Sequence, residues 1–139
     1  MFENILVAVD GSKYSDKAFD VAIDMAKKYG TSLFILYVFQ GSSGTGIIVS
    51  PGFEDDLRSA GQEILDSYGA KVKEKHLQNV RMLLLEGDPA QKIIESASAE
   101  KSGLVIIGSR GRGGFRELML GSVSHKVANH AGCPVLIVR

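Results

Sequence analysis

Short apolar runs that alternate with helical segments constrain the fold of this chain most strongly. Most of these runs are apolar at consecutive positions, which is typical of strands covered on both faces of a parallel sheet. Because strand and helix patterns alternate throughout, we predict an α/β fold with an open, doubly wound, five-stranded parallel sheet and helices on both faces. The predicted strands are Ile5–Val9, Ser32–Val38, Val80–Leu85, Leu104–Ile107 and Val135–Val138.

The segments between these runs have the apolar spacing of amphipathic helices. Asp88 precedes Pro89, which predicts a helix N-cap followed by proline at the first helical position. Gly30 and Gly132 lie where two of the helices should end. The first helix is predicted to cover the sheet with a stripe of Ala18, Val21, Met25 and Tyr29.

Length and charge describe an ordinary globular domain. The chain has 139 residues, so we expect a single domain spanning residues 1–139. Lysine plus arginine and aspartate plus glutamate number 16 each, and the formal net charge is zero. Because a nucleic-acid-binding protein usually carries a basic surplus, no nucleic-acid partner is expected.

The location expected from the sequence is the cytoplasm. Cys133 is the only cysteine, so an intramolecular disulfide is excluded and a reducing compartment fits. Its position before Pro134 and an apolar run favours a buried structural thiol over a reactive one. The first residues lack the features of a signal peptide, and no apolar stretch approaches the length that spans a bilayer, so no membrane association is expected.

A spaced glycine motif follows the fourth predicted strand. Gly108, Gly111 and Gly121 are separated by two and nine residues, and Ser122 comes directly after the last glycine. Glycines leaving a buried strand let backbone N–H groups approach an anion, and a helix that begins at Gly121-Ser122 adds unpaired donors and a positive dipole end. The motif therefore predicts a phosphate site.

This motif, Asp10 after the first strand and the ending Gly132–Arg139 together resemble the universal stress protein family, and within it the ATP-binding branch. The resemblance covers essentially the whole chain and implies one nucleotide-binding domain. It implies the strand order 3-2-1-4-5, which places the loops after the first and fourth strands across one crevice. Ligands of open α/β sheets bind at such a point.

The resemblance also assigns roles to individual residues. The backbone of Val38 would pair with the adenine edge, and Ala8 and Val9 would line the purine pocket. Asp10 would contact the ribose, or the phosphates through a cation. The full set of expected nucleotide-binding residues is Ala8, Val9, Asp10, Val38, Gly108, Ser109, Arg110, Gly111, Arg112, Gly121, Ser122, Val123 and Ser124.

Several of these residues have a second interpretation. Asp10 could cap the following helix or shape a turn, since Asp-Gly is a common turn pair. Ser122 could be an ordinary N-cap, and the hydroxyl of Ser124 could bond backbone in place of a phosphate. Arg110 and Arg112 suit phosphate through their forked donors, but they could also lie in a solvated loop.

Other chemistries find little support in the sequence. The P-loop, the dinucleotide-binding fingerprint and the nucleophile elbow are all absent. His125, His130 and Cys133 have poor spacing for a zinc site, so no protein-held metal site is expected. We predict no catalytic residue.

The function predicted from these features is an ATP-binding stress-response protein that acts as a nucleotide-dependent switch. AMP or another adenine nucleotide is an alternative ligand, and Mg²⁺ or Mn²⁺ would be held mainly by the phosphates. A slow metal-dependent ATPase is the alternative function, in which Asp10 would hold the metal and the arginines would stabilise the transferred phosphate. The switch is preferred because no residue is an evident candidate to position the attacking water. A purely structural dimer with an empty cleft is a third interpretation, and the intact motif argues against it.

The remaining expectations concern partners. By the resemblance, Val135–Val138 forms an outer strand that pairs with its copy in a second chain, which predicts a homodimer. The glycine- and serine-rich residues 40–52 suggest either a mobile insertion or a lid or partner-binding segment. An unidentified regulatory protein partner is expected as well.

Overall fold

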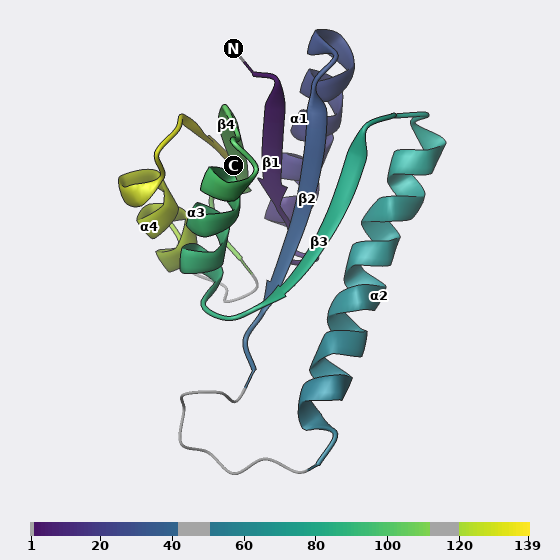
Figure 1. The fold of residues 1–139 in the computed structure, drawn as a ribbon, viewed down its shortest axis with the longest axis vertical. Coiled ribbons are helices and arrows are strands. Elements are labelled where there is room, and N and C mark those ends of the chain that lie inside the picture. Colours follow the sequence, from purple (N-terminus) through teal and green to yellow (C-terminus); the bar gives the residue numbers. More distant parts are fainter. Residues whose placement is uncertain (1, 42–50, 112–119) are drawn as a thin grey trace.

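The computed structural model describes residues 2–41, 51–111 and 120–139. Strands and helices alternate along the chain, and all five strands form one parallel sheet in the order β3-β2-β1-β4-β5 (Figure 1). The predicted α/β fold and strand order are confirmed. The elements are β1 (Asn4–Ala8), α1 (Lys13–Tyr29), β2 (Ser32–Phe39), α2 (Phe53–Glu74), β3 (Val80–Glu86), α3 (Pro89–Ala99), β4 (Leu104–Gly108), α4 (Ser122–His130) and β5 (Val135–Val138).

The strand order reverses at β1, the central strand. From β1 the chain adds β2 and β3 on one side, and then β4 and β5 on the other. Ala8, the last residue of β1, pairs with Leu36 of β2 and with Ile107 of β4. The carboxyl ends of β1 and β4 therefore lie side by side at the point where ligands of this fold class bind.

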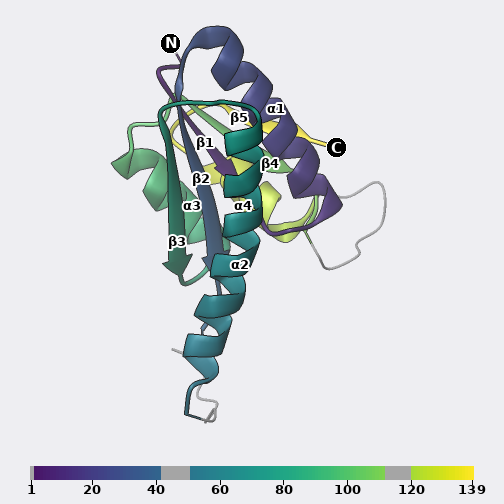
Figure 2. The same cartoon turned by 90° about the vertical axis from the view of Figure 1, so that its right-hand side faces the viewer.

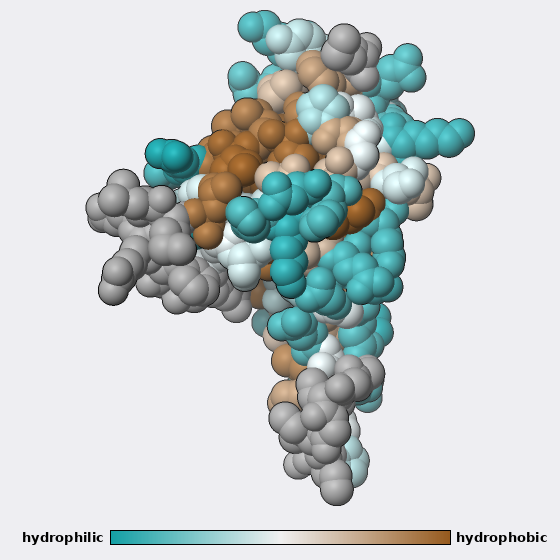
Figure 3. All heavy atoms as spheres, turned by 90° about the vertical axis from the view of Figure 1, so that its left-hand side faces the viewer, coloured by the Kyte–Doolittle hydropathy of each residue, from teal (hydrophilic) through white to brown (hydrophobic). Residues whose placement is uncertain are grey.

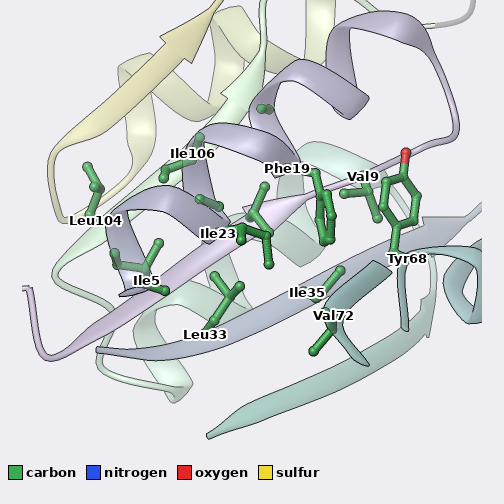
Figure 4. Close-up of a cluster of buried hydrophobic side chains, with 14 of the residues drawn as sticks. Ile5, Val9, Phe19, Ile23, Leu33, Ile35, Tyr68, Val72, Leu104 and Ile106 are labelled. Carbon is green, nitrogen blue, oxygen red and sulfur yellow. The ribbon is translucent and has the colours of Figure 1, made fainter. Parts of the chain in front are cut away.

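Helices cover both faces of the sheet. Helices α1 and α2 lie on one side of the sheet and α3 on the other (Figure 2). The buried side chains of α1 and α2 belong to one core cluster, and those of α3 and α4 belong to a second. In the first of these clusters, Phe19 and Ile23 of α1 lie over Ile35 of β2, with Tyr68 and Val72 of α2 beside them (Figure 4). Each fully buried side chain of this size contributes roughly 1.5–3 kcal/mol to stability.

Burial differs between the central and the edge strands. Ile5, Leu6 and Val7 of β1 are completely buried, because neighbouring residues point to opposite faces and each face has its own core. The side chains of β3 and β5 are half-buried or exposed. A consecutive apolar run thus predicts burial on both faces correctly for β1 and β4, and overestimates it at the edges.

The helix ends follow the predicted signals. Asp88 caps α3, because its side chain accepts a hydrogen bond from the Gln91 N–H, and Pro89 is the first helical residue. Gly30 ends α1 with a left-handed backbone, at φ 65°. Helix α4 ends at His130, two residues before Gly132. In the described part of the chain, no helix has the length and apolar character needed to cross a membrane.

The predicted stripe of α1 was partly wrong. Ala18 is buried, but Tyr29 is 58% exposed, and Val21 and Met25 are only half-buried. Tyr29 is the last residue of the helix, where the chain turns away from the core at Gly30. The residues that face the sheet are Ser15, Ala18, Phe19, Ala22, Ile23 and Ala26.

Candidate functional site

A cavity of about 250 Å³ opens where the carboxyl ends of β1 and β4 meet. The loop after β1 contributes Asp10, and the loop after β4 contributes Arg110 and Gly111. The first residues of α4 complete it. Two segments that are about a hundred residues apart in the sequence thus form one site, as the strand order predicts.

One end of the cavity is apolar. Its wall comes from the ends of three neighbouring strands and from one side of α3. Such a wall suits a flat, mostly apolar group, because ligand pockets combine apolar surfaces with a few placed polar groups. The apolar residues are Ala8, Val9, Leu36, Val38, Pro89, Ile93 and Ile107.

Val38 adds backbone polar groups to this apolar end. The carbonyl of Leu36 accepts a hydrogen bond from Val9 N–H, on the β1 side of β2. Backbone groups two residues apart in a strand point to the same edge, so the N–H and C=O of Val38 also face the β1 side. Strand β1 has ended there, since Ala8 is its last residue to pair with β2. A donor and an acceptor therefore face the cavity side by side.

The other end of the cavity is polar. Asp10, Ser15, Arg110, Ser122 and Ser124 contribute to it, together with the three motif glycines. Among the described residues that line the cavity, Asp10 and Arg110 are the charged ones. This end can therefore offer both a carboxylate and a guanidinium to one ligand.

Two of the motif glycines make room for protein atoms. A Cβ on Gly108 would lie 2.8 Å from the carbonyl carbon of Tyr14, so the end of β4 touches the first turn of α1. A Cβ on Gly111 would lie 2.8 Å from Asp10 Oδ2. Gly108 thus lets β4 approach α1, and Gly111 lets the two loops meet, while the predicted approach of backbone to phosphate stays a prediction.

The N-terminus of α4 points unpaired donors at the cavity. The first intrahelical bond runs from His125 N–H to the Gly121 carbonyl, which leaves Ser122, Val123 and Ser124 ahead of it. Their N–H groups have no side-chain cap, because the N-cap residue is Gly121. Helices α1 and α3, by contrast, are capped by Ser12 and Asp88. Ser122 is thus the first residue of the helix, and its interpretation as an N-cap was wrong.

Ser109 joins the two ends of the segment between β4 and α4. Its carbonyl accepts hydrogen bonds from Gly121 N–H at 2.8 Å and from Ser124 Oγ at 3.1 Å. Its N–H donates to the Val138 carbonyl at 2.7 Å. Ser109 is buried and does not line the cavity, whereas Ser124 does, although its hydroxyl bonds backbone here.

Asp10 shapes the loop after β1. Its Oδ1 accepts a hydrogen bond from Ser12 N–H at 2.8 Å, which is an Asx turn. Ser12, not Asp10, caps α1, because its hydroxyl accepts from Ser15 N–H. The turn role of Asp10 is observed and the cap role is excluded. Its second oxygen, Oδ2, lies against Gly111.

Arg110 is held by an aromatic residue that the sequence did not single out. Its Nη1 donates a hydrogen bond to Tyr14 Oη at 3.0 Å, and its guanidinium lies 5.3 Å from the centre of the Tyr14 ring. The Nε atom is buried and has no hydrogen-bond partner among the described residues. Arg112 lies outside the described residues, so its predicted contact stays a prediction.

Most of the expected binding residues come together at the cavity. Apart from Ser109 and Arg112, every residue of the predicted set lines it. Sequence reasoning missed five other residues that line the cavity. The rule that ligands bind at strand ends could have found Ile107, because it stands beside Gly108. The missed lining residues are Ser15, Leu36, Pro89, Ile93 and Ile107.

The protein alone offers little to a metal ion. In residues 2–41, 51–111 and 120–139, no group of three or more histidines, cysteines and acids is placed to hold one. His125 bonds Asn129 at 3.1 Å on the exposed side of α4. Cys133 is half-buried against the second core cluster, and burial raises the pKa of its thiol, which fits a structural role.

Comparison with known proteins agrees with this architecture. The sequence profile described as "Universal stress protein family" matches residues 1–139. Universal stress protein YxiE of Bacillus subtilis is 42% identical, and the match covers 100% of both chains.

Solved structures share the fold. A universal stress protein in complex with cAMP has a TM-score of 0.78 at 24% identity, covering 99% of this chain and 97% of the other. The universal stress protein of Archaeoglobus fulgidus in complex with dAMP has a TM-score of 0.72 at 21% identity, with coverages of 99% and 98%. Full-length matches in profile, sequence and fold lead to one conclusion: this chain belongs to the universal stress protein family.

Proposed function

We propose that this chain is an adenine-nucleotide-dependent regulatory protein of the ATP-binding branch, with residues 1–139 forming one nucleotide-binding domain. One observation carries the proposal. The cavity extends from its apolar end, at Val38, to the N-terminus of α4, which has no side-chain cap. A nucleotide has the matching chemistry, with an apolar, hydrogen-bonding base at one end and anions at the other.

The base belongs at the Val38 end. Adenine presents an amino donor next to a ring-nitrogen acceptor, which complements the neighbouring C=O and N–H of Val38. Ile93 and Ile107 offer apolar contact to the faces of a purine. The relatives solved with cAMP and dAMP, both adenine nucleotides, support this assignment.

The phosphates belong at the α4 end. Three unpaired N–H groups and the positive end of the helix dipole favour an anion there. Arg110 adds charge-assisted donors from the facing loop. ATP is the proposed ligand, and AMP or another adenine nucleotide remains an alternative, because the same donors accept any phosphate.

A cation would complete the charge balance, since Asp10 would otherwise repel the phosphates. Asp10 fits such a cation, because Oδ2 faces the loop at Gly111 while Oδ1 is engaged by Ser12. One carboxylate supplies few of the oxygen ligands that such a cation needs. Mg²⁺ or Mn²⁺ would therefore be held mainly by phosphate oxygens, as is usual for Mg²⁺. When bound, the ion neutralises phosphate charge.

A switch explains the site better than an enzyme does. The described cavity residues include one acid, Asp10, and no histidine, lysine or glutamate. A site that binds the ground state and the transition state equally well gives affinity without rate. A slow metal-dependent ATPase, with Asp10 and Arg110 at the phosphates, is the rival that the experiment below must exclude.

The proposal includes a homodimer formed through β5. This strand is the sheet edge next to β4, and Leu136 is 37% exposed on it. Figure 3, which views the molecule from this end of the sheet, shows a broad apolar area on the surface. An apolar edge strand is a liability unless another strand covers it. A cytoplasmic location and an unidentified regulatory protein partner complete the proposal.

The test starts with the small molecule that co-purifies with the protein, identified by mass spectrometry. We expect an adenine nucleotide. Phosphate release is then followed with ATP and Mg²⁺ or Mn²⁺, and the expected rate is far below the enzyme range of ~1–10³ s⁻¹. Turnover of about 1 s⁻¹ or faster that is lost in Asp10→Asn without loss of binding would establish the ATPase in place of the switch.

A further inference from the structure

A chain of buried and partly buried hydrogen bonds connects α2 to the candidate site. Tyr68, in the middle of α2, is 1% exposed, and its ring packs on Phe19 with 4.9 Å between the ring centres. Figure 4 shows its hydroxyl pointing out of the apolar cluster, past Val9. That hydroxyl lies 2.8 Å from Ser15 Oγ and 2.6 Å from Asp16 Oδ1.

The donors in this chain can be assigned from chemistry. A carboxylate only accepts, so the Tyr68 hydroxyl donates to Asp16. The Tyr68 oxygen therefore accepts a hydrogen bond from Ser15 Oγ. The Ser15 hydroxyl has a second acceptor for its proton, the Ser12 carbonyl at 3.2 Å. Ser15 Oγ in turn accepts from the Asp10 N–H at 3.1 Å. The bonds thus run in one direction, from Asp10 through Ser15 and Tyr68 to Asp16.

This arrangement bears on the site because Asp10 and Ser15, the first two members of the chain, line the cavity. Ser15 lines the cavity and is 4% exposed, and Asp10 is the acid of the cavity. Burial, and then the hydrogen bond to Asp16, raise the pKa of the Tyr68 hydroxyl, so it keeps its proton and remains a donor. Chains of buried hydrogen bonds strengthen one another, and a partly broken chain leaves a costly unsatisfied group.

We propose that Tyr68 is a positioning residue for the nucleotide site, which holds Ser15 and through it the Asp10 loop in the conformation that binds the ligand. The inference rests on the proposed function. It makes α2, which lines none of the cavity, part of the binding apparatus. Neither the family resemblance nor the glycine motif assigns a role to this residue.

The first test needs no ligand. Tyr68→Phe removes one oxygen and keeps the ring that packs on Phe19, and Tyr29→Phe is the matched control because Tyr29 is 58% exposed. Hydrogen exchange of the Asp10 amide is measured by NMR, relative to that of the buried Ile35 amide, which corrects for global stability. In Tyr68→Phe we expect the ratio to rise at least ~10-fold, and in the control we expect no change. An unchanged ratio would overturn the proposal.

The second test asks whether Tyr68 acts through Asp10. Calorimetry measures ATP affinity in the presence of Mg²⁺ for wild type, Tyr68→Phe, Asp10→Asn and the double variant. Tyr68→Phe should weaken binding about 5- to 10-fold alone and less than about twofold in the Asp10→Asn background. Equal losses in both backgrounds would show a role that is only structural, and would contradict the proposal.

Two safeguards keep the tests decisive. If Tyr68→Phe does not fold, Asp16→Ala removes the acceptor of the Tyr68 hydroxyl and leaves Ser15 Oγ as the acceptor of the Asp10 amide, so a rise of the same exchange ratio is expected from it. If wild type binds no nucleotide, the proposed function fails. The exchange of the Asp10 amide still decides in that case whether Tyr68 holds the loop.

Discussion

The carboxylate of Asp10 occupies the space that a side chain at position 111 would need. A Cβ built on Gly111 would lie 2.8 Å from Asp10 Oδ2, although the two residues are about a hundred positions apart in the sequence. The loops after β1 and β4 therefore meet without a gap at the polar end of the cavity. Because of this close approach, a side chain at position 111 should disturb the site and leave the hydrophobic core unchanged.

Gly111→Ala should therefore weaken ATP binding while leaving stability almost unchanged. The new methyl group must displace the Asp10 carboxylate, and we expect affinity to fall by about tenfold, or ~1.4 kcal/mol. Calorimetry and thermal unfolding measure the two quantities. Gly132→Ala is the control, because a Cβ there meets nothing within 4 Å, and it should change neither. Undiminished affinity in Gly111→Ala would show that Asp10 is not in the binding site.

Arg110→Lys should weaken the binding of ATP more than that of adenosine. Lysine keeps the charge but loses the planar fork and its contact with the Tyr14 ring, so we expect a loss of about fivefold or more for ATP alone. Arg81→Lys is a matched control. Arg81 also stacks on an aromatic ring, that of Phe34, and pairs with Glu100 at 3.5 Å, but it does not line the cavity. Equal losses for ATP and adenosine would remove Arg110 from the phosphate end.

Leu136→Lys should shift the protein from dimer to monomer. Leu136 is exposed on β5, whereas Val135 and Ile137 pack against the second core cluster, so a charge at position 136 tests the edge without damaging the fold. Sedimentation at micromolar concentration measures the change, with Tyr29→Lys as the control at an exposed site elsewhere. A monomeric wild type would contradict the proposed dimer.

Two glycines of α2 should respond to alanine in opposite ways. A Cβ on Gly69 would have Met82 Cε as its nearest neighbour at 3.9 Å, so Gly69→Ala should raise the free energy of unfolding by about 0.5–1 kcal/mol through helix propensity. A Cβ on Gly61 would lie 2.8 Å from the Tyr37 ring. Overpacking there costs roughly 1–3 kcal/mol, so Gly61→Ala should be less stable than wild type. Urea unfolding of both variants checks the pair, and a stabilised Gly61→Ala would show that the contact between α2 and β2 is looser than described.

Much of the fold could be predicted because it depends on local patterns. Apolar runs placed every strand to within a residue or two, and Asp88-Pro89 and Gly30 marked helix ends through capping chemistry alone. The order of the strands depends on long-range packing, and only the family resemblance supplied it. The stripe of α1 was placed incorrectly at Tyr29, because apolar spacing does not show where the sheet beneath a helix ends.

The site was predictable in position and less so in its physical detail. The strand-end rule and the glycine spacing, together with the strand order that the family resemblance implies, predicted that Asp10 and Gly111 lie at one crevice. The contact of Gly108 with Tyr14, and the bonds that link Tyr68 to Ser15, arise only when α1 and α2 pack on the sheet. No motif records such contacts, because they join residues whose spacing in the sequence has no fixed meaning.

The most direct test of the central claim is a calorimetric titration of the purified, nucleotide-free protein with ATP in the presence of Mg²⁺, repeated with GTP. The account predicts one ATP per chain, bound with a Kd below about 100 μM and at least about tenfold more tightly than GTP, because guanine places an acceptor where the Val38 carbonyl requires a donor. Absence of ATP binding, or equal affinity for the two nucleotides, would contradict an adenine-nucleotide site at this cavity.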